Sequence, residues 1–169
     1  MRLMLLLAAI CVSGCATSVV DYKSGTDFSI YQQASVRKDD SQKDTSIDTV
    51  RIQAALKKHL PEQGLTVAMS DAQLEVVGRL VEYSRYEGNQ VSWGFGGARD
   101  SLAIGLSAPI SADERKQYRL EIEFVDIATK QVVWKAKSTQ AMDENYGAEK
   151  RDKWIDKNVA RMLMRYPPK

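Results

Sequence analysis

Apolar and polar residues alternate most regularly between residues 118 and 139, and this alternation predicts a β-hairpin with its turn at Ala128-Thr129. One face of the hairpin would be apolar and would consist of Leu120, Ile122, Phe124, Val132, Trp134 and Ala136. The opposite face would be charged and would consist of Glu121, Glu123, Lys135 and Lys137. The pattern therefore predicts one side packed on a core and one side with a row of opposite charges.

Two segments repeat apolar residues at the period of an α-helix. The first would begin at Thr45, which has Asp48 three residues later as in a capping box, and would end at Leu60 before Pro61. Its apolar stripe would consist of Ile47, Val50 and Ala54. The second helix would end before Pro167 and Pro168. Its apolar stripe would consist of Ile155, Val159, Met162, Leu163 and Tyr166.

The remaining patterns predict further strands. Residues 18–37 would form two short strands around a turn at Ser24-Gly25, with Phe28 and Ile30 alternating in the second. A short strand follows at residues 65–69, and a long one at residues 72–86 contains Gly78, which indicates a bulge or a close approach. Residues 87–116 lose the pattern and are interpreted as a mobile hairpin. These elements together predict a single α+β domain with a mostly antiparallel β-sheet and two main amphipathic helices packed on one face.

The N-terminal segment resembles a bacterial lipoprotein signal. The apolar run of residues 3–12 is far shorter than the roughly 20 residues of a membrane-spanning helix, and Arg2 gives it a basic start. "VSGC" at residues 12–15 resembles a lipobox, in which cleavage falls between Gly14 and Cys15 and the cysteine is lipidated. The expected organisation is a signal peptide at 1–14, a lipidated N-terminus and short tether at 15–22, and one domain at 23–169. The alternative is a secreted protein that is cut nearby and in which Cys15 is incidental.

Lipidation would fix both the chemistry of the cysteines and the location of the protein. Cleavage removes Cys11, so no disulfide, cysteine nucleophile or cysteine-based metal site would remain. The lipid chains would hold the domain at a bilayer, with no long tether between them. In a Gram-negative host, an Asp directly after the lipidated cysteine resembles an inner-membrane retention signal. This chain has Ala16 at that position instead. The expected location is therefore the periplasmic face of the outer membrane.

Charge and composition exclude a nucleic-acid partner. The chain has 24 Lys and Arg against 22 Asp and Glu, and it is 44% hydrophobic and 27% charged. This near-neutral balance gives no electrostatic reason to bind nucleic acid.

Candidate chemistry is sparse. His59 is the only histidine and is expected to be solvated on the polar side of the first helix, so neither a zinc site nor a serine–histidine site is predicted. Glu121 and Glu123 would lie about 7 Å apart on one strand face, a spacing that overlaps that of inverting glycosidases but also fits an exposed charged face. Trp93 and Phe95 lie among glycines, either folded back on the sheet or exposed as a partner contact. We expect no cofactor and no metal.

Several motifs taken in order resemble one family. They are "VVDYKSGTDFSIYQ", "WGFGG", "LEIEFVDIATKQVVWKA" and the closing "NVARMLMRYPPK". In this order they resemble the bacterial lipoproteins of domain-of-unknown-function family 4136. The resemblance implies a small domain with a largely antiparallel sheet and packed helices, and it implies no catalytic residues.

These observations favour a non-enzymatic binding or assembly module. It would be anchored to the membrane by lipid on Cys15 and would contact another envelope component. The predicted contact residues are Trp93, Phe95, Glu121, Glu123, Lys135 and Lys137. One alternative is a carrier or sensor of a small apolar ligand held between sheet and helices. The second alternative is a hydrolase that acts on glycans.

Overall fold

The computed structural model describes residues 18–37, 46–85 and 115–168. Its strands are β1 (Ser18–Tyr22), β2 (Gln33–Arg37), β3 (Thr66–Val67), β4 (Leu74–Arg85), β5 (Arg115–Asp126), β6 (Gln131–Ser138) and β7 (Met142–Asp143). Its α-helices are α1 (Ile47–His59) and α2 (Ala148–Leu163), and two short 3₁₀ turns lie at Phe28–Ile30 and Pro61–Gln63. Four of the predicted site residues lie outside the described residues: Gly14, Cys15, Trp93 and Phe95. Residues 87–114 of the hairpin expected at 87–116 also lie outside them, and residues 115 and 116 begin β5.

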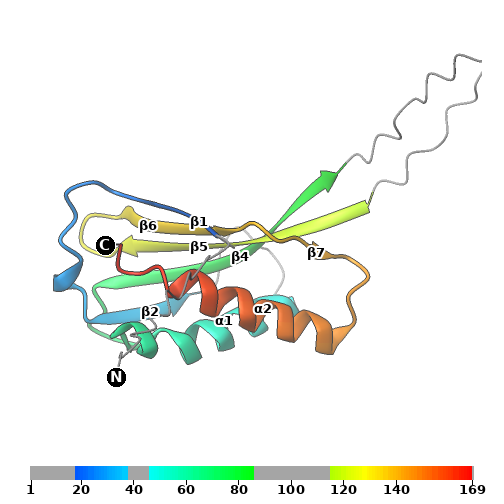
Figure 1. The fold of residues 1–169 in the computed structure, drawn as a ribbon. Coiled ribbons are helices and arrows are strands. Elements are labelled where there is room, and N and C mark those ends of the chain that lie inside the picture. Colours follow the sequence, from blue (N-terminus) through cyan, green and yellow to red (C-terminus); the bar gives the residue numbers. More distant parts are fainter. Residues whose placement is uncertain (1–17, 38–45, 86–114, 169) are drawn as a thin grey trace, which may run out of the picture.

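All seven strands form one sheet in the order β1-β6-β5-β4-β2-β3, with β7 also paired to β5 (Figure 1). The pairs β1–β6, β6–β5, β5–β4 and β5–β7 are antiparallel, whereas β2 pairs in parallel with both β3 and β4. The parallel pair β2–β4 is possible because α1 carries the chain across the sheet between them. The prediction of an α+β domain with a mostly antiparallel sheet is confirmed.

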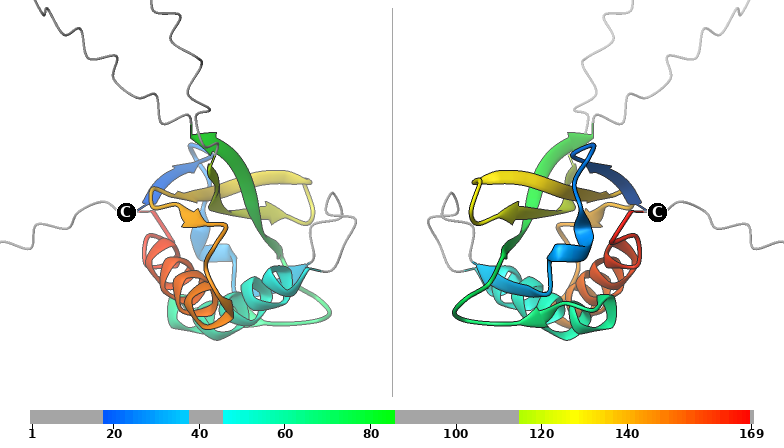
Figure 2. Two further views of the ribbon diagram at one scale, coloured as in Figure 1. Left: turned by 90° about the vertical axis from the view of Figure 1, so that its right-hand side faces the viewer. Right: turned by 90° about the vertical axis from the view of Figure 1, so that its left-hand side faces the viewer.

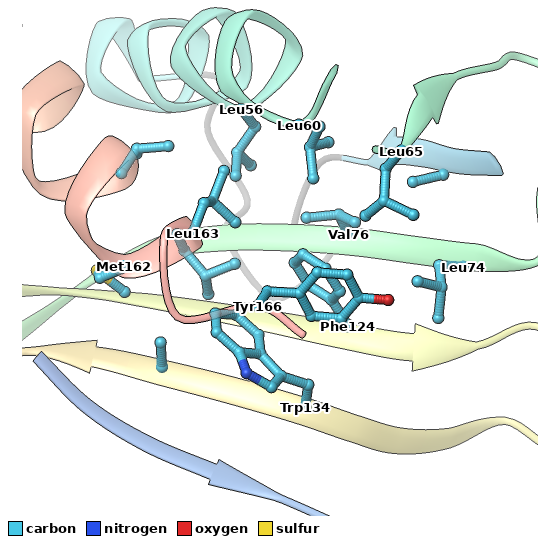
Figure 3. Packing of buried hydrophobic residues seen from close by; sticks show 14 of the residues in the cluster. Leu56, Leu60, Leu65, Leu74, Val76, Phe124, Trp134, Met162, Leu163 and Tyr166 are labelled. Carbon is cyan, nitrogen blue, oxygen red and sulfur yellow. The ribbon is translucent and has the colours of Figure 1, made fainter. Parts of the chain in front are cut away.

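Both helices cover the same face of this sheet (Figures 1 and 2). α1 packs against β2 and β4, and α2 packs against β1, β5 and β6. Alternate residues of the strands meet the helices in one core, and Trp134, Phe124 and Tyr166 lie against one another at its centre (Figure 3). The predicted stripe of α2 is confirmed, because each of its five residues is buried.

Gly78 marks a close approach between β4 and α1. A Cβ atom at this position would lie 2.5 Å from Cγ2 of Ile52 and 3.2 Å from Cδ1 of Leu56. The absence of a side chain therefore allows the helix to come down onto the strand, and of the two predicted reasons for this glycine the close approach is confirmed.

The predicted buried face of α1 is wrong. Ile47 and Val50 are 71% and 53% exposed, while the buried apolar residues of the helix are Ile52, Ala55 and Leu56. The helix has apolar residues around most of its circumference, so the sequence permits two stripes. The stripe with Ile52 and Leu56 fits over Gly78 and continues into buried Leu60. The N-cap is Ser46, whose Oγ accepts a hydrogen bond from the backbone N–H of Thr49 at 3.1 Å, rather than Thr45.

Two strand predictions also need correction. The first two strands do not pair with each other around the turn at Ser24-Gly25, because β1 and β2 lie on opposite sides of the β6-β5-β4 core of the sheet. Phe28 and Ile30 belong to a 3₁₀ turn. The first of the two strands predicted within residues 18–37 is present as β1, and its residues 18–22 overlap the tether expected at 15–22.

The hairpin β5–β6 has one irregularity that the alternation does not reveal. The pairing register shifts between Phe124 and Val125, which is a β-bulge. As a result Val133 is buried and Val132 is 42% exposed, the reverse of the prediction for Val132.

Candidate binding surface

The face of the sheet that points away from the helices carries charged side chains across four strands. Register places Glu121 opposite both Arg79 and Lys137. It also places Lys135 opposite both Glu123 and Asp21. We call this set the charged ladder; it consists of Asp21, Arg79, Glu121, Glu123, Lys135 and Lys137. Opposite charges directly across antiparallel strands stabilise the pairing modestly.

Arg79 on β4 joins the two glutamates of β5. Its Nη2 lies 2.8 Å from Oε1 of Glu123 and 3.0 Å from Oε2 of Glu121, and its Nη1 lies 3.1 Å from Oε2 of Glu123. Hydrogen bonds to Glu123 raise the pKa of the Arg79 guanidinium. Burial lowers this pKa, but the hydrogen bonds and the charges of both glutamates outweigh burial. The two parallel bonds to Glu123 fix the orientation of both side chains.

Glu121 lies between two cations. Its Oε1 accepts a hydrogen bond from Nζ of Lys137 at 2.7 Å, and its Oε2 accepts one from Arg79. Burial raises the pKa of Glu121, but the hydrogen bonds and charges of Lys137 and Arg79 outweigh burial and hold the pKa below its usual value. A glycosidase acid needs a raised pKa, so this carboxylate suits an ion pair better than acid catalysis.

A shallow depression of ≈ 320 Å³ opens on the charged ladder. Its rim on β1 is formed by Asp21, which lies 3.1 Å from Nζ of Lys135, and by Val19, which is 61% exposed. Lys135 and Lys137 are about half exposed, at 54% and 47% of their side chains, whereas Glu121 is only 17% exposed. Asp21 is the most exposed charge of the charged ladder, at 67% of its side chain, and Lys135 and Lys137 are its most exposed cations.

The prediction that Glu121, Glu123, Lys135 and Lys137 share one face is confirmed. Arg79 and Asp21 complete the charged ladder and were not among the predicted contact residues. Arg79 alternates with Gly78 and Leu80, and that alternation is the signal that could have placed its side chain on the outer face. The pairing partner of Asp21 could not have been found this way, because β1 pairs with a strand more than 100 residues away.

His59 is not solvated, contrary to the prediction. It is 7% exposed and is held between α1, the turn that follows it, and α2. Its Nδ1 lies 3.1 Å from Oε1 of Glu62, and its Nε2 lies 3.0 Å from Oδ1 of Asp156. The helical period placed His59 on the wrong side because the whole buried face of α1 was misassigned. The ring bridges the two helices as a structural contact.

The space between sheet and helices is filled by side chains. Trp134 is fully buried, with its ring centroid 4.8 Å from that of Phe124 and 5.7 Å from that of Tyr166 (Figure 3). The depression on the charged ladder and the one between β1 and the end of α2 both open on outer surfaces. No observation in the described part of the chain therefore favours the hypothesis of a ligand carried between sheet and helices.

Neither a metal-binding cluster nor a membrane-spanning helix is found within the described residues. Among residues 18–37, 46–85 and 115–168, no group of three or more His, Cys, Asp or Glu side chains could hold a metal ion. Within the same residues, no helix has the length and apolar character needed to cross a bilayer.

A family model described as a domain of unknown function, DUF4136, matches residues 18–168. The chain belongs to the DUF4136 family. The resemblance found from the sequence motifs is thereby confirmed, and the start of the match at residue 18 coincides with the start of β1. A search of the curated proteins finds no match to this DUF4136 chain.

Solved structures share the fold of this DUF4136 chain. A PDZ domain protein from Parabacteroides distasonis matches with a TM-score of 0.60 and 16% identity, over 91% of this chain and 36% of that protein. The chain therefore spans little more than a third of that relative. A DUF4136 family protein from Bacteroides thetaiotaomicron matches with a TM-score of 0.51 and 13% identity, over 89% and 95% of the two chains. A minor lipoprotein from Acinetobacter baumannii gives a TM-score of 0.42 at 9% identity, over 80% and 92%. At these identities the first two matches show the fold alone.

Proposed function

We propose that this DUF4136 protein is a lipid-anchored protein of the cell envelope that binds another envelope component without catalysing a reaction. The observation that carries the proposal is the charged ladder, which lies on the sheet face that the helices leave uncovered. Its fixed geometry, with Arg79 bonded to both glutamates, presents the cations of Lys135 and Lys137 in defined positions. A fixed pattern of charge selects partners by complementarity more than it adds raw affinity.

The proposed anchor is lipid on Cys15. The lipobox-like "VSGC" and the short apolar run before it support anchoring, and Ala16 supports the periplasmic face of the outer membrane in a Gram-negative host. Multiple acyl chains hold a protein at a bilayer effectively permanently. Cys15→Ser should abolish labelling by radioactive palmitate and release the protein from membranes. Retention of the Cys15→Ser protein in washed membranes would contradict the anchor.

Crosslinking in living cells tests the binding surface. A photoreactive residue at Val19 would report on the depression, because Val19 lines it and lies opposite Lys137 in the strand register. We expect a discrete protein adduct that is lost when Lys135 and Lys137 are both changed to Glu. The matched control changes two exposed lysines elsewhere, Lys57→Glu and Lys130→Glu, and should leave the adduct intact. An adduct of unchanged yield in both double variants would place the binding surface elsewhere.

A further inference from the structure

The outward side of α2 is basic because two of the three acidic residues of the helix, Asp152 and Asp156, are used against α1. Asp152 lies 3.6 Å from Nε of Arg51, and Asp156 accepts hydrogen bonds from Lys58 at 2.9 Å and from His59 at 3.0 Å. These carboxylates therefore point toward the neighbouring helix. Lys153 pairs with the third acidic residue, Glu149, at 2.6 Å, and Lys150 lies over the ring of Tyr146. The basic residues that remain are Lys157 and Arg161 of α2, and Arg165 just after the end of the helix.

The positive charge is concentrated in the second half of this helix. From residue 157 to residue 168 the chain has three basic side chains, at four-residue spacing, and no acidic one. That spacing places Lys157, Arg161 and Arg165 along one side of the helix. Within the described residues, neither Lys157 nor Arg161 has a carboxylate partner. The charge is therefore available to a partner outside the domain.

An apolar groove adjoins this basic stripe. It has a volume of ≈ 390 Å³ and lies between the edge strand β1 and the end of α2. Its lining includes Met164, which is 67% exposed, and Tyr22, which is 48% exposed. Its other lining residues are Val20, Arg165, Pro167 and Pro168. Exposed apolar and aromatic side chains beside cations are typical of surfaces that lie in the headgroup region of a bilayer.

The described chain begins beside this same surface. Nη1 of Arg165 donates a hydrogen bond to the backbone oxygen of Ser18 at 2.9 Å, and Figure 2 shows β1 beside the end of α2. Cys15 precedes Ser18 by three residues, a length of chain that spans at most about 11 Å. A lipid on Cys15 would therefore bring the bilayer within reach of Arg165, whatever path those residues take.

We propose that the outward side of α2 and the adjoining groove form a surface that lies against anionic phospholipid headgroups. This inference rests on the lipid anchor of the proposed function. It adds an orientation, because α2 and the β1 edge would face the bilayer while the charged ladder on the outer sheet face would remain free for a partner. Each basic side chain at a bilayer surface contributes roughly a fivefold preference for anionic lipid.

Spin labels on the lipidated protein in vesicles test this orientation. The labels would be attached at Met164→Cys, in the groove, and at Met69→Cys, a fully exposed methionine near the opposite edge of the sheet. The vesicles would be phosphatidylcholine with or without phosphatidylglycerol. We expect the label at residue 164 to be shielded from a water-soluble relaxation agent when phosphatidylglycerol is present. We expect the label at residue 69 to remain accessible.

Charge reversal then tests the basic stripe itself. Lys157→Glu with Arg161→Glu should abolish the increase in shielding that phosphatidylglycerol causes. The loss of the two cations alone should reduce the preference for anionic lipid on the order of 25-fold. Lys57→Glu with Lys130→Glu is the matched control and should retain it. Equal accessibility of both labels, or shielding that ignores both phosphatidylglycerol and the reversal, would overturn the proposal. Shielding in cells but not in protein-free vesicles would assign this surface to a protein partner and would also overturn it.

The same preparation distinguishes the two proposals. The mass of the purified protein reports acylation directly, and a spin label on the parent chain would report a free Cys15 thiol. An acylated protein with a fully accessible label at residue 164 refutes the orientation and leaves the anchor intact. A protein without acylation refutes the anchor and the orientation together.

Discussion

The two faces of the sheet are made from alternate residues of the same strands, yet different forces hold them. On the helix side, Ile122 and Trp134 are 0% exposed and pack in an apolar core. On the outer side, their neighbours Glu121, Glu123 and Lys135 are fixed by ion pairs between partly exposed groups. Apolar burial is worth several kcal/mol per large side chain, whereas exposed pairs are worth about 1 kcal/mol or less. The inner face therefore sets stability, and the outer face is free to serve recognition.

Trp134→Ala should cause the largest loss of stability. Trp134 is fully buried against Phe124 and Tyr166, so truncation removes transfer free energy and leaves a cavity. We expect a loss of about 3–5 kcal/mol in the free energy of unfolding, measured by urea denaturation. Val132→Ala on the same strand is the control, because Val132 is 42% exposed, and it should cost less than about 1 kcal/mol. Similar losses in the two variants would contradict the assignment of the faces.

Gly78→Ala should destabilise the inner face by overpacking. The new Cβ would meet Cγ2 of Ile52 at 2.5 Å, and that methyl sits on a stiff branched side chain. We expect a loss of about 1–3 kcal/mol by the same measurement. Ile52→Leu removes the branching methyl, so the double variant should lose less than the sum of the single changes. Additive losses would show that contact with Ile52 is not what disfavours a side chain at residue 78.

Arg79→Gln should have a smaller effect on the outer face, one that depends on pH. It removes the cation between Glu121 and Glu123 and should cost about 1 kcal/mol at neutral pH. The folded pKa of Glu121 is lowered, so its contribution to stability is present above the ordinary glutamate pKa. That contribution is lost as pH falls through the folded value.

Denaturation of wild type and Arg79→Gln at several pH values checks this sign. The difference in the free energy of unfolding between the two proteins should narrow below about pH 4.5 as Glu121 protonates. Lys116→Gln is the control, because it breaks only the exposed pair with Glu82 and should cost less than about 0.5 kcal/mol. A difference that widens on acidification would contradict the lowered pKa of Glu121.

Lys135→Ala should have the smallest effect on stability. The lysine is 54% exposed and its partner Asp21 is 67% exposed, so the free energy of unfolding should change by less than about 0.5 kcal/mol. The yield of the crosslink from Val19 should nevertheless fall. A large change in stability without a change in crosslinking would reverse the comparison between the two faces.

Local patterns in the sequence predicted the elements whose buried face is determined by their own residues. The hairpin β5–β6, the long strand β4 and the buried stripe of α2 follow from alternation and helical period, because each has one clearly apolar face. The same reasoning found the close approach at Gly78. Four members of the charged ladder followed directly from the alternation of the hairpin.

The misassignments arose where distant parts of the chain decide the outcome. α1 offers two apolar stripes, and the choice between them depends on the fit of Ile52 over Gly78. His59 is buried because its two partners, Glu62 and Asp156, come from a following turn and from the other helix. β1 pairs with β6 rather than with β2, which is the next strand in the sequence. The turn at Ser24-Gly25 does not indicate which strand β1 will pair with.

The pairing of β1 also bears on the order in which the chain folds. Ser18 pairs with Ser138, and its backbone oxygen is held by Arg165, 147 residues later. During synthesis from the N-terminus, β1 is the first of the described strands to be made, and its described strand partner does not exist until β6 is made. Its contact with α2 must wait longer still. Contacts of such long sequence separation slow folding, because a large loop must close before they form. Although β1 is synthesised early, it should therefore be among the last elements to dock onto the sheet.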